Sequence, residues 1–404
     1  MVIISGLLSL TLTAAGQSWV QTTSLPDGYQ EHGLAYAQGF LFHTGGVSAN
    51  NAELSGTNVF YAQVFSNGTI GVWMTNTPVP EAVFDHASVA ANGYLYVLGG
   101  YHYTTAASDY LSAAVYYAKV NTNGVLGSWQ TANPLPYPVY FHSAAVWDNR
   151  IYVIGGLTDK GATNQVLSAN IQPNGSLSEW IAQTPLPYGL AGHASVVAND
   201  VLYVISGAIS NGTKLTNSVC LVNIAPDGTL GNWIQTTHIP QAVANFASVA
   251  ANGFIFAVGG FNGSSAINGF VNAQVAGDGS LKSWTSGTPL PISVFYHAAA
   301  VSDSYIFVSG GNAPTITSPN VYSIALPAPP VVPTLVAHSF TNGNFQVQLA
   351  SSTNTGFGLL ASTNLTSWTN IGWGFTGTNG TLLFTDTNAA RFPHRFYPAY
   401  WPLP

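Results

Sequence analysis

The chain has 404 residues, of which 47% are hydrophobic, 12% aromatic and only 5% charged, and its formal net charge is −7. Seven basic residues cannot form the cationic surface that nucleic-acid binding requires, and a single cysteine excludes an intrachain disulfide or a cysteine-rich metal cluster. The apolar, glycine-rich and aromatic composition predicts a folded all-β protein without a transmembrane anchor. So low a content of charged residues favours an extracellular or cell-surface location.

Residues 1–16 are apolar and end in small residues, and two interpretations of them stay open. One is a secretory signal peptide, although no Lys or Arg precedes the apolar stretch. The other is a retained strand, because Leu8, Leu10 and Leu12 alternate with polar residues. A free apolar strand of this kind can complete a sheet in a neighbouring subunit, which would join subunits into a fibre.

A repeat of six copies organises residues 17–327. Each copy has a Trp, then a His thirteen residues later, then a small pair a further thirteen residues on, which is Gly-Gly in every copy except Ser206-Gly207. The tryptophans are Trp19, Trp73, Trp129, Trp180, Trp233 and Trp284, and the histidines are His32, His86, His142, His193 and His297. Phe246 replaces the histidine of the fifth copy without changing the spacing, so we interpret these histidines as structural residues and not as metal ligands.

Each copy predicts four strands. In the second copy they are residues 86–90, 94–98 and 114–120 and the strand that carries Trp129, and Asn-Gly turns follow the first and third strands. A recurring four-stranded sheet must stack on its neighbours to bury its faces. The chain enters on the strand of Trp19, and the sixth copy lacks a strand of this kind, so we expect the Trp19 strand to close the ring.

The His that opens the first strand, the Gly pair that ends the second and the Trp of the fourth together resemble the kelch repeat. This resemblance implies a six-bladed β-propeller over residues 17–327. It also implies a protein that binds partners more often than one that catalyses a reaction.

The C-terminal part has a different pattern. Residues 328–333 form a stiff, proline-rich linker, and residues 334–404 alternate apolar and polar positions, which predicts a small β-sandwich. Residues 361–368, 384–386 and 395–397 of this part resemble a C-terminal module of secreted proteins from Verrucomicrobia-type bacteria. The resemblance implies secretion and no activity.

The loops that precede the histidines are rich in aromatic residues and contain a few acids. They join successive blades, and the loops after the Gly pairs lie on the same face, so this face is the candidate surface for a protein or glycan partner. The candidate ligand-binding residues are Tyr29, Glu31, Phe84, Asp85, Tyr140, Phe141, Tyr188, Phe295 and Tyr296. The alternative is that half of them pack between blades.

Catalytic patterns are scarce. A sialidase would need three clustered arginines, but only Arg150 of the three arginines lies in the ring, and Cys220 on an outer strand cannot serve an axial copper site. A glycosidase needs two facing carboxylates, for which Glu31 and Glu81 on separate loops are weak candidates. We therefore expect no catalytic residue, metal or cofactor. A carbohydrate-active enzyme ranks third. It follows a binding module and, as the alternative, a subunit of an extracellular filament or surface layer that is joined through the N-terminal strand or the C-terminal module.

Six asparagines open an Asn-X-Ser/Thr sequence, which is the acceptor motif for N-glycosylation. They are Asn67, Asn174, Asn211, Asn262, Asn364 and Asn379. Most of them stand in Asn-Gly turns, so the motif also follows from turn chemistry alone.

Overall fold

The computed structural model describes residues 17–51, 55–103, 109–209, 214–276, 278–327, 334–341, 344–351, 356–363, 369–391 and 399–400. The chain divides into two compact units, Met1–Pro327 and Ala328–Pro404. The predicted leader 1–16 and linker 328–333 lie outside the described residues. In the described part of the chain, no helix has the length and apolar character needed to cross a membrane.

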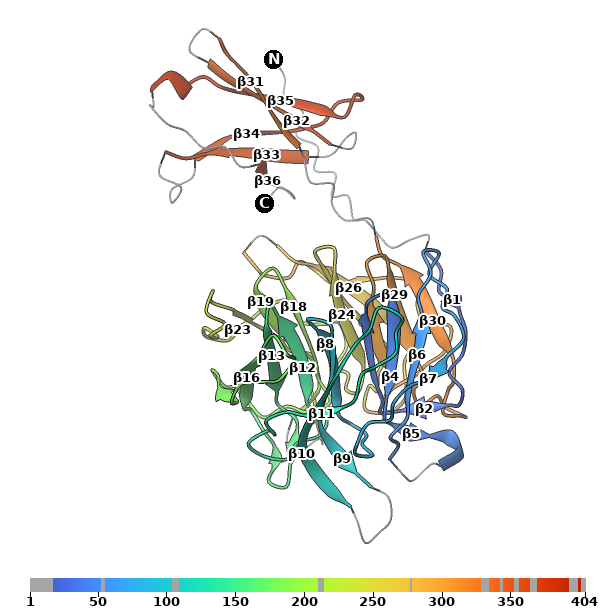
Figure 1. Ribbon diagram of the computed structural model, residues 1–404. Helices are drawn as coiled ribbons and strands as arrows, with labels where there is room; N and C mark the ends of the chain where they lie inside the picture. Colours follow the sequence, from blue (N-terminus) through green and yellow to red (C-terminus); the bar gives the residue numbers. More distant parts are fainter. Residues whose placement is uncertain are drawn as a thin grey trace. The chain divides into compact units, whose positions relative to one another are not determined.

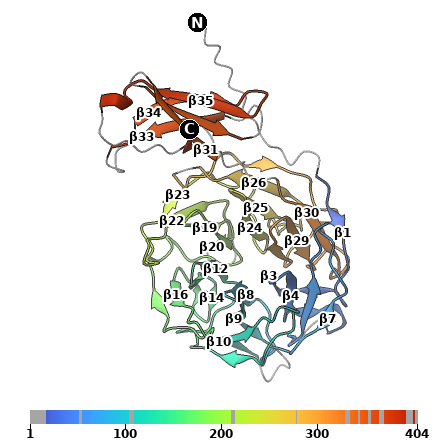
Figure 2. The same cartoon turned by 45° about the horizontal axis from the view of Figure 1, so that its top comes forward.

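The first unit contains six four-stranded antiparallel sheets arranged in a circle, as Figures 1 and 2 show, which confirms the predicted six-bladed propeller. Blade 1 consists of β3 (Gly33–Ala37), β4 (Phe40–Thr44), β6 (Val59–Gln63) and β7 (Met74–Thr75). Blade 2 consists of β8 (Ala87–Ala91), β9 (Tyr94–His102), β10 (Tyr110–Lys119) and β11 (Gln130–Thr131). Blade 3 consists of β12 (Ser143–Trp147), β13 (Arg150–Ile154), β16 (Val166–Asn170) and β17 (Ile181–Ala182). Blade 4 consists of β18 (Ala194–Ala198), β19 (Val201–Ile205), β22 (Val219–Asn223) and β23 (Ile234–Gln235). Blade 5 consists of β24 (Ala247–Ala251), β25 (Phe254–Val258), β26 (Phe270–Gln274) and β27 (Thr285–Ser286). Blade 6 consists of β28 (Ala298–Val301), β29 (Tyr305–Ser309), β30 (Val321–Ala325) and β1 (Val20–Gln21).

Short ribbons and one turn of 3-10 helix decorate the blades. They are β2 (Tyr29–Gln30) with β5 (Val47–Ser48), β14 (Leu157–Thr158) with β15 (Gly161–Ala162), β20 (Ala208–Ile209) with β21 (Lys214–Leu215), and η1 (Ala49–Asn51). The hairpin of β9 and β10 is longer than the sequence predicted, because pairing continues past a bulge between Ser112 and Val115 to the pair of Tyr110 and His102.

The N-terminal strand closes the ring. β1 pairs with β30, so that Val20 lies opposite Ser323 and Gln21 opposite Tyr322. The adjacent Trp19 packs edge-on against Phe270 with ring centroids 5.2 Å apart. The strand at the start of the chain therefore completes the last blade, as its missing partner in the sixth copy predicted.

The repeated tryptophans join neighbouring blades. Each indole N–H donates a hydrogen bond to a backbone carbonyl of the adjacent blade, at 2.8–3.1 Å in all six cases. The acceptors are the carbonyls of Thr288, Thr23, Thr77, Asn133, Thr184 and Thr237. One residue in each copy thus fixes the register between blades, which explains its even recurrence.

The Gly pairs leave room for the histidines. A Cβ on Gly155 would lie 2.8 Å from Cε1 of His193, and a Cβ on Gly156 would lie 2.7 Å from Cβ of His142. The first glycine is therefore contacted by the histidine of the next blade and the second by the histidine of its own blade. Both have a left-handed φ, which glycine adopts without strain.

The two departures from the repeat meet at one joint. Ser206 takes the place of the first glycine in blade 4, and this is the position that a histidine of blade 5 would contact. Blade 5 has Phe246 there instead. The Ser206 hydroxyl donates to the carbonyl of Val243 at 2.7 Å, so the serine holds its left-handed conformation through a bond of its own. Ser206 and Phe246 form a matched pair.

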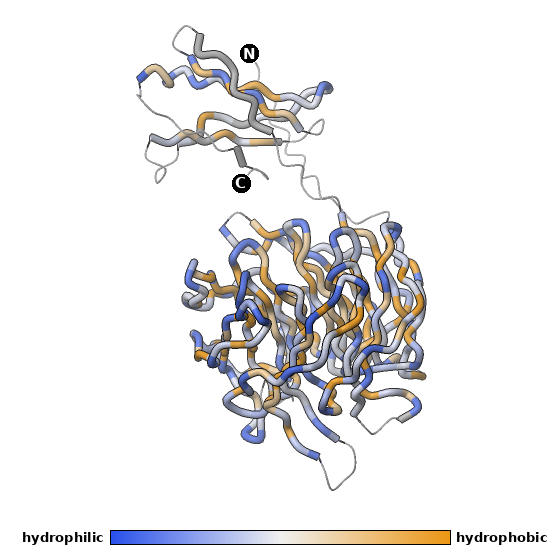
Figure 3. Tube along the Cα trace, viewed as in Figure 1, coloured by the Kyte–Doolittle hydropathy of each residue, from blue (hydrophilic) through white to orange (hydrophobic). Residues whose placement is uncertain are grey.

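The apolar core consists of six clusters, and each lies between two adjacent blades. The cluster between blades 3 and 4, for example, includes Tyr152, Ile154, Leu202 and Val204, all of which are at most 2% exposed. Hydrophilic residues gather in many of the turns between strands, as Figure 3 shows. Burial between blades holds the ring together and leaves the loops free to carry function.

The second unit has two three-stranded sheets with a shared core. One sheet is β31 (Thr334–Thr341), β32 (Asn344–Ala350) and β35 (Thr381–Asp386), and the other is β34 (Thr369–Phe375), β33 (Gly356–Ala361) and β36 (Ala399–Tyr400). A second turn of 3-10 helix is η2 (Ala389–Arg391). Val347, Leu349 and Phe384 of the first sheet pack with Phe357 and Leu359 of the second.

Candidate functional site

One face of the propeller carries two sets of loops. The inner strand of every blade begins at this face, and the second strand ends there at the Gly pair. In blades 2 to 6 the loop before the inner strand pairs with the residue after the Gly pair through a single bridge, as Phe84 does with Tyr101 and Tyr140 does with Leu157. In blade 1 the short strands β2 and β5 make the same connection. We call this surface the loop face.

Six residues form a closed ring at the centre of the loop face, and we call it the axial ring. Its members are Glu31, Asp85, Phe141, Gly192, Asn245 and Tyr296, one from each blade. Every member has a φ between 51° and 59°, and every backbone N–H donates to the carbonyl of the preceding member at 2.8–3.0 Å. The six backbone N–H groups are all used within the ring, which holds the side chains of its five non-glycine members around the axis.

Two aromatic members of the axial ring meet across the axis. Phe141 belongs to blade 3 and Tyr296 to blade 6, which are opposite blades in a ring of six. Their rings nevertheless stack, with centroids 5.8 Å apart and planes inclined by 20°. The two side chains therefore lie over the mouth of the axial channel.

This stack is the middle of a longer row of aromatic side chains, which we call the aromatic band. Its members, in spatial order, are Phe84, Tyr101, Tyr140, Phe141, Tyr296, Phe295 and Phe261, and successive centroids lie 4.6–5.8 Å apart. Each member is partly exposed. Tilted aromatic pairs at such distances stabilise one another, so the band is a continuous, rigid apolar strip across the loop face.

Two carboxyl groups stand next to this band. Burial raises the pKa of Glu31 to about 7, and burial together with the nearby Glu31 raises the pKa of Asp85 well above its ordinary value. No described residue donates a hydrogen bond to either carboxyl group. Burial and the charge of Asp85 also raise the pKa of the Tyr140 and Tyr296 hydroxyls.

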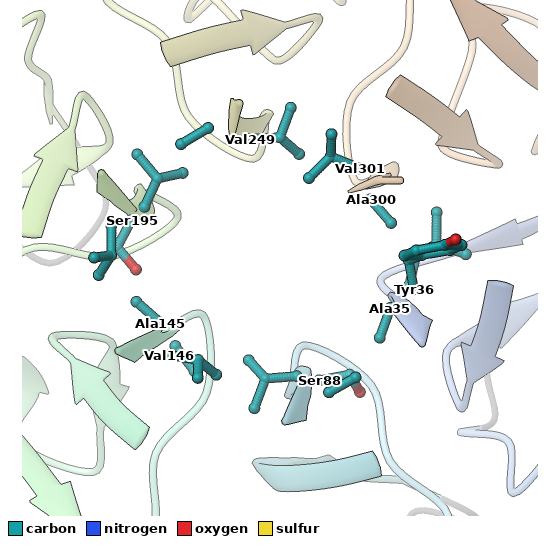
Figure 4. Close-up of a pocket in the computed structure, with 16 residues that line it drawn as sticks. Ala35, Tyr36, Ser88, Ala145, Val146, Ser195, Val249, Ala300 and Val301 are labelled. Atoms are coloured by element: carbon teal, nitrogen blue, oxygen red, sulfur yellow. The ribbon is translucent and has the colours of Figure 1, made fainter. Parts of the chain in front are cut away.

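The axial channel below the ring offers little chemistry. It encloses about 240 Å³ and is lined by the inner strands of all six blades, whose Ala, Val and Ser side chains surround an open centre in Figure 4. Tyr36 is the sole titratable residue among those that line it. Catalysis by acid and base groups within this channel is therefore unsupported.

Most of the predicted ligand-binding residues come together at this site. Phe84, Tyr140, Phe141, Phe295 and Tyr296 belong to the aromatic band, and Glu31 and Asp85 to the axial ring. Tyr140 and Phe141 are only partly exposed, because both pack on neighbouring aromatic rings.

Tyr29 and Tyr188 lie elsewhere. Tyr29 is 4% exposed, accepts a hydrogen bond from Asn58 at 3.0 Å and packs on His43, so it serves the interior of blade 1. Tyr188 is half-buried and packs on the cluster between blades 3 and 4.

Four site residues were missed by sequence reasoning. Tyr101 and Phe261 directly follow a Gly pair, and Gly192 and Asn245 occupy the ring positions before His193 and Phe246. The signal was available, because the position after the Gly pair is fixed by the repeat. The candidates were instead taken only from the loops before the histidines.

Glu81 does not face Glu31, so the weak candidate pair for a glycosidase is not formed. Its carboxylate accepts hydrogen bonds from Ser112 at 3.0 Å and from Tyr116 at 3.3 Å. This network belongs to blade 2 and explains Glu81 without a catalytic role.

The repeated histidines are buried, and three of them hydrogen-bond across a blade joint. Nε2 of His32, His86 and His193 lies 2.8–3.0 Å from a hydroxyl of Ser309, Thr44 and Ser143, respectively. Burial lowers the pKa of His86 and His193 to about 3, so the rings are neutral at pH 7. Within the described residues, no three His, Cys, Asp or Glu side chains converge to hold a metal ion.

Four of the six sequon asparagines lie in described turns. Asn67, Asn174 and Asn379 are exposed, and each accepts a hydrogen bond from the Ser or Thr hydroxyl two residues later at 2.7–2.9 Å. Asn262 accepts backbone hydrogen bonds from Ser264 and Ser265. Asn211 and Asn364 lie outside the described residues.

Residues 31–260, more than half of the chain, match the family model described as the KLHDC2/KLHL20/DRC7 Kelch-repeats domain. The chain belongs to the kelch-repeat family. This kelch chain is 26% identical to Kelch-like protein 40 of Xenopus laevis over 228 residues, which cover 56% of this chain and 34% of that protein. It is 29% identical to alpha-scruin of Limulus polyphemus over 204 residues, covering 50% of this chain and 22% of that protein.

Other matches extend further along the chain. Kelch-like protein terF of Aspergillus terreus is 25% identical over 302 residues, covering 71% of this chain and 61% of that protein. The solved structure of YjhT superposes with a TM-score of 0.60 at 17% identity, covering 75% of this kelch chain and 96% of that one. At this identity the match shows the propeller fold alone. Kelch-like protein 40, alpha-scruin and terF are all longer than the part that this chain matches.

Proposed function

We propose that this kelch propeller is a non-enzymatic module that binds a protein partner on the aromatic band. The observation that carries the proposal is the row of seven partly exposed aromatic rings across the loop face. Aromatic residues are enriched in protein interfaces and among the residues that contribute most to binding energy, because they bury a large area at a small cost in side-chain entropy. A rigid band of this kind is already ordered before the partner arrives.

The surroundings of the band support binding over catalysis. The channel below it is lined by small and apolar side chains, the repeated histidines are engaged in packing, and Glu81 is hydrogen-bonded within its own blade. An extracellular or cell-surface location is part of the proposal. The low charge of the chain supports it, as does the resemblance of the C-terminal part to a module of secreted bacterial proteins.

The test is to select peptides against the full chain from a phage-displayed library and to measure their affinity for variants. Tyr101→Ala and Phe295→Ala interrupt the band on either side of the axis without changing the axial ring. We expect each to weaken binding at least tenfold. Phe65→Ala is the matched control, because Phe65 is 43% exposed next to a turn on the opposite face.

Equal affinity for the three variants would refute binding on the band. If the library yields no peptide while an array of oligosaccharides yields a ligand that needs Tyr101 and Phe295, the partner is a glycan and the protein-binding proposal fails.

A second candidate function is self-association into a filament or layer. Apolar residues stand on the outermost strands of four blades, one position after the tryptophan: Val20, Met74, Ile181 and Ile234 are each 52–55% exposed. The two-residue edge strands that carry them are open to pairing or packing with another copy. Sedimentation of the wild type beside an Ile181→Asp/Ile234→Asp variant tests this candidate, because assembly through these edges must be lost in the variant.

A further inference from the structure

Glu31 and Asp85 have no role in the proposed function, although they lie beside the aromatic stack at its centre. We propose that the axial ring recognises an arginine side chain of the partner, whose guanidinium group docks against the two carboxylates and the rings of Phe141 and Tyr296. This inference rests on the proposed function, because the arginine would belong to the partner that binds on the aromatic band.

The ring geometry sets the two acids side by side. Glu31 and Asp85 are consecutive members of the axial ring, and the N–H of Asp85 donates to the carbonyl of Glu31 at 3.0 Å. Their φ angles are 59° and 53°, so both residues have the left-handed φ that all members of the ring share. Two neighbouring carboxyl groups form a natural receptor for a group with several N–H donors.

The burial of Asp85 is uncompensated within the chain. This side chain is 8% exposed, yet no described residue donates a hydrogen bond to its carboxyl group, and no described Lys or Arg acts on it. The charge of Glu31 of blade 1 acts on Asp85, and the charge of Asp85 acts on the hydroxyls of Tyr140 of blade 3 and Tyr296 of blade 6, so this carboxyl group lies near residues of three other blades. Buried acids normally have a donor or a cation as partner, so the missing partner points to a ligand.

The surroundings select an organic cation over a metal ion. Ca²⁺ requires six to eight oxygen ligands, but the carbonyls of the axial ring are already bonded to the ring's own N–H groups. A guanidinium group needs only the carboxylates for its N–H donors, and its flat faces stack on aromatic rings. Phe141 and Tyr296 supply such rings. Arginine suits the site better than lysine, whose compact ammonium group is more strongly hydrated.

The test uses the full chain and N-acetyl-arginine amide as the probe, with binding followed by titration calorimetry at pH 8 and low salt. We expect saturable binding by the wild type, a loss of at least tenfold in affinity for Glu31→Gln/Asp85→Asn, and no change for the matched surface variant Glu179→Gln. N-acetyl-lysine amide should bind more weakly, and the neutral norleucine amide should not bind.

The variant that removes the acids should fold, because it replaces two repelling buried carboxyl groups with neutral side chains of the same shape. Its thermal unfolding is measured alongside. Affinity for the arginine probe should also fall as the pH is lowered from 8 to 6, since Glu31 takes up a proton in this range, whereas Tyr140 and Tyr296 keep their protons throughout.

Four results would overturn the arginine site. They are equal affinity of wild type and double variant, no binding of the arginine probe, tighter binding of the lysine probe, and Ca²⁺ binding that the double variant abolishes. If library peptides still require Tyr101 and Phe295 in that case, the arginine site is refuted while the proposed function stands. If no peptide depends on the band either, both fail together.

Discussion

The buried histidines make the stability of this propeller depend on pH, and the matched pair of Ser206 and Phe246 provides a way to measure the effect. Burial lowers the pKa of His142 to about 4, whereas a histidine in an unfolded chain has a pKa of about 6.5. The unfolded chain therefore binds more protons than the folded one below this value. The contribution to stability is fully present above about pH 6.5 and is lost as the pH falls toward 4.

The magnitude follows from the two pKa values. Between pH 7 and pH 5.5, protonation of one such histidine in the unfolded chain lowers the free energy of unfolding by about 1.2 kcal/mol. We propose a His142→Phe/Gly99→Ser variant, which copies the natural pair of Ser206 and Phe246 into another joint. The carbonyl of Val139 corresponds to the carbonyl of Val243, which accepts the hydrogen bond of the Ser206 hydroxyl in blade 4. A Cβ on Gly99 would lie 2.7 Å from this oxygen, so the backbone must shift in the variant, and this cost is the same at both pH values.

The assay is urea unfolding of wild type and variant at pH 7 and at pH 5.5. The variant should lose about 1.2 kcal/mol less stability than the wild type over this interval. The reciprocal variant, Phe246→His/Ser206→Gly, should lose about 1.2 kcal/mol more. The contribution of Glu31 to this pH dependence has the opposite sign, because its raised pKa makes the folded state bind the extra proton. This contribution is the same in the wild type and in both variants, so it cancels when they are compared. Losses that agree within about 0.3 kcal/mol would refute the assignment of these histidines as buried neutral groups.

Three further predictions concern the Gly pair of blade 2, the carboxyl group of Glu31, and the strand of Trp19 that closes the propeller. Gly100→Ala should lower the free energy of unfolding in urea by at least about 2 kcal/mol more than Gly253→Ala does. The reason is that a Cβ on Gly100 would lie 2.8 Å from the Cβ of His86, whereas a Cβ on Gly253 would have no atom within 4 Å. Glu31→Gln should raise the melting temperature at pH 8 but not at pH 5, where the wild-type carboxyl group is already protonated in the folded state. Trp19→Ala should lower the free energy of unfolding by about 3–5 kcal/mol by calorimetry, although Trp19 stands only two residues after the start of the described chain.

The fold followed from the sequence because the same contacts recur in every blade. Trp, His and Gly-Gly each contact a neighbouring blade, so the spacing between them is a direct record of blade geometry. Closure by the Trp19 strand was also readable, because one blade lacked its fourth strand. The longer hairpin of β9 and β10 was not predicted, because it depends on pairing past a bulge that no turn motif marks.

The site followed only in part. The aromatic loops were recognisable, but the axial ring depends on a left-handed backbone at six positions whose side chains share no chemistry. Glu31, Phe141 and Gly192 occupy equivalent positions and are as different as an acid, an aromatic residue and glycine. Only the backbone hydrogen bonds reveal their equivalence, so the pairing of Glu31 with Asp85 and the stacking of Phe141 on Tyr296 required coordinates.

The pairing of β1 with β30, which closes the propeller, has a mechanical consequence. The side chain of Gln17 donates a hydrogen bond to the carbonyl of Leu326 at 3.4 Å, so the two ends of the propeller leave it at the same place. A force that pulls these two ends apart loads the pairs of the two-residue strand β1 one after another, as in unzipping, and not all at once, as in shear. A propeller tethered at both ends would therefore open at low tension, whereas one held by a partner on the loop face and by its C-terminal end alone would keep its ring closed.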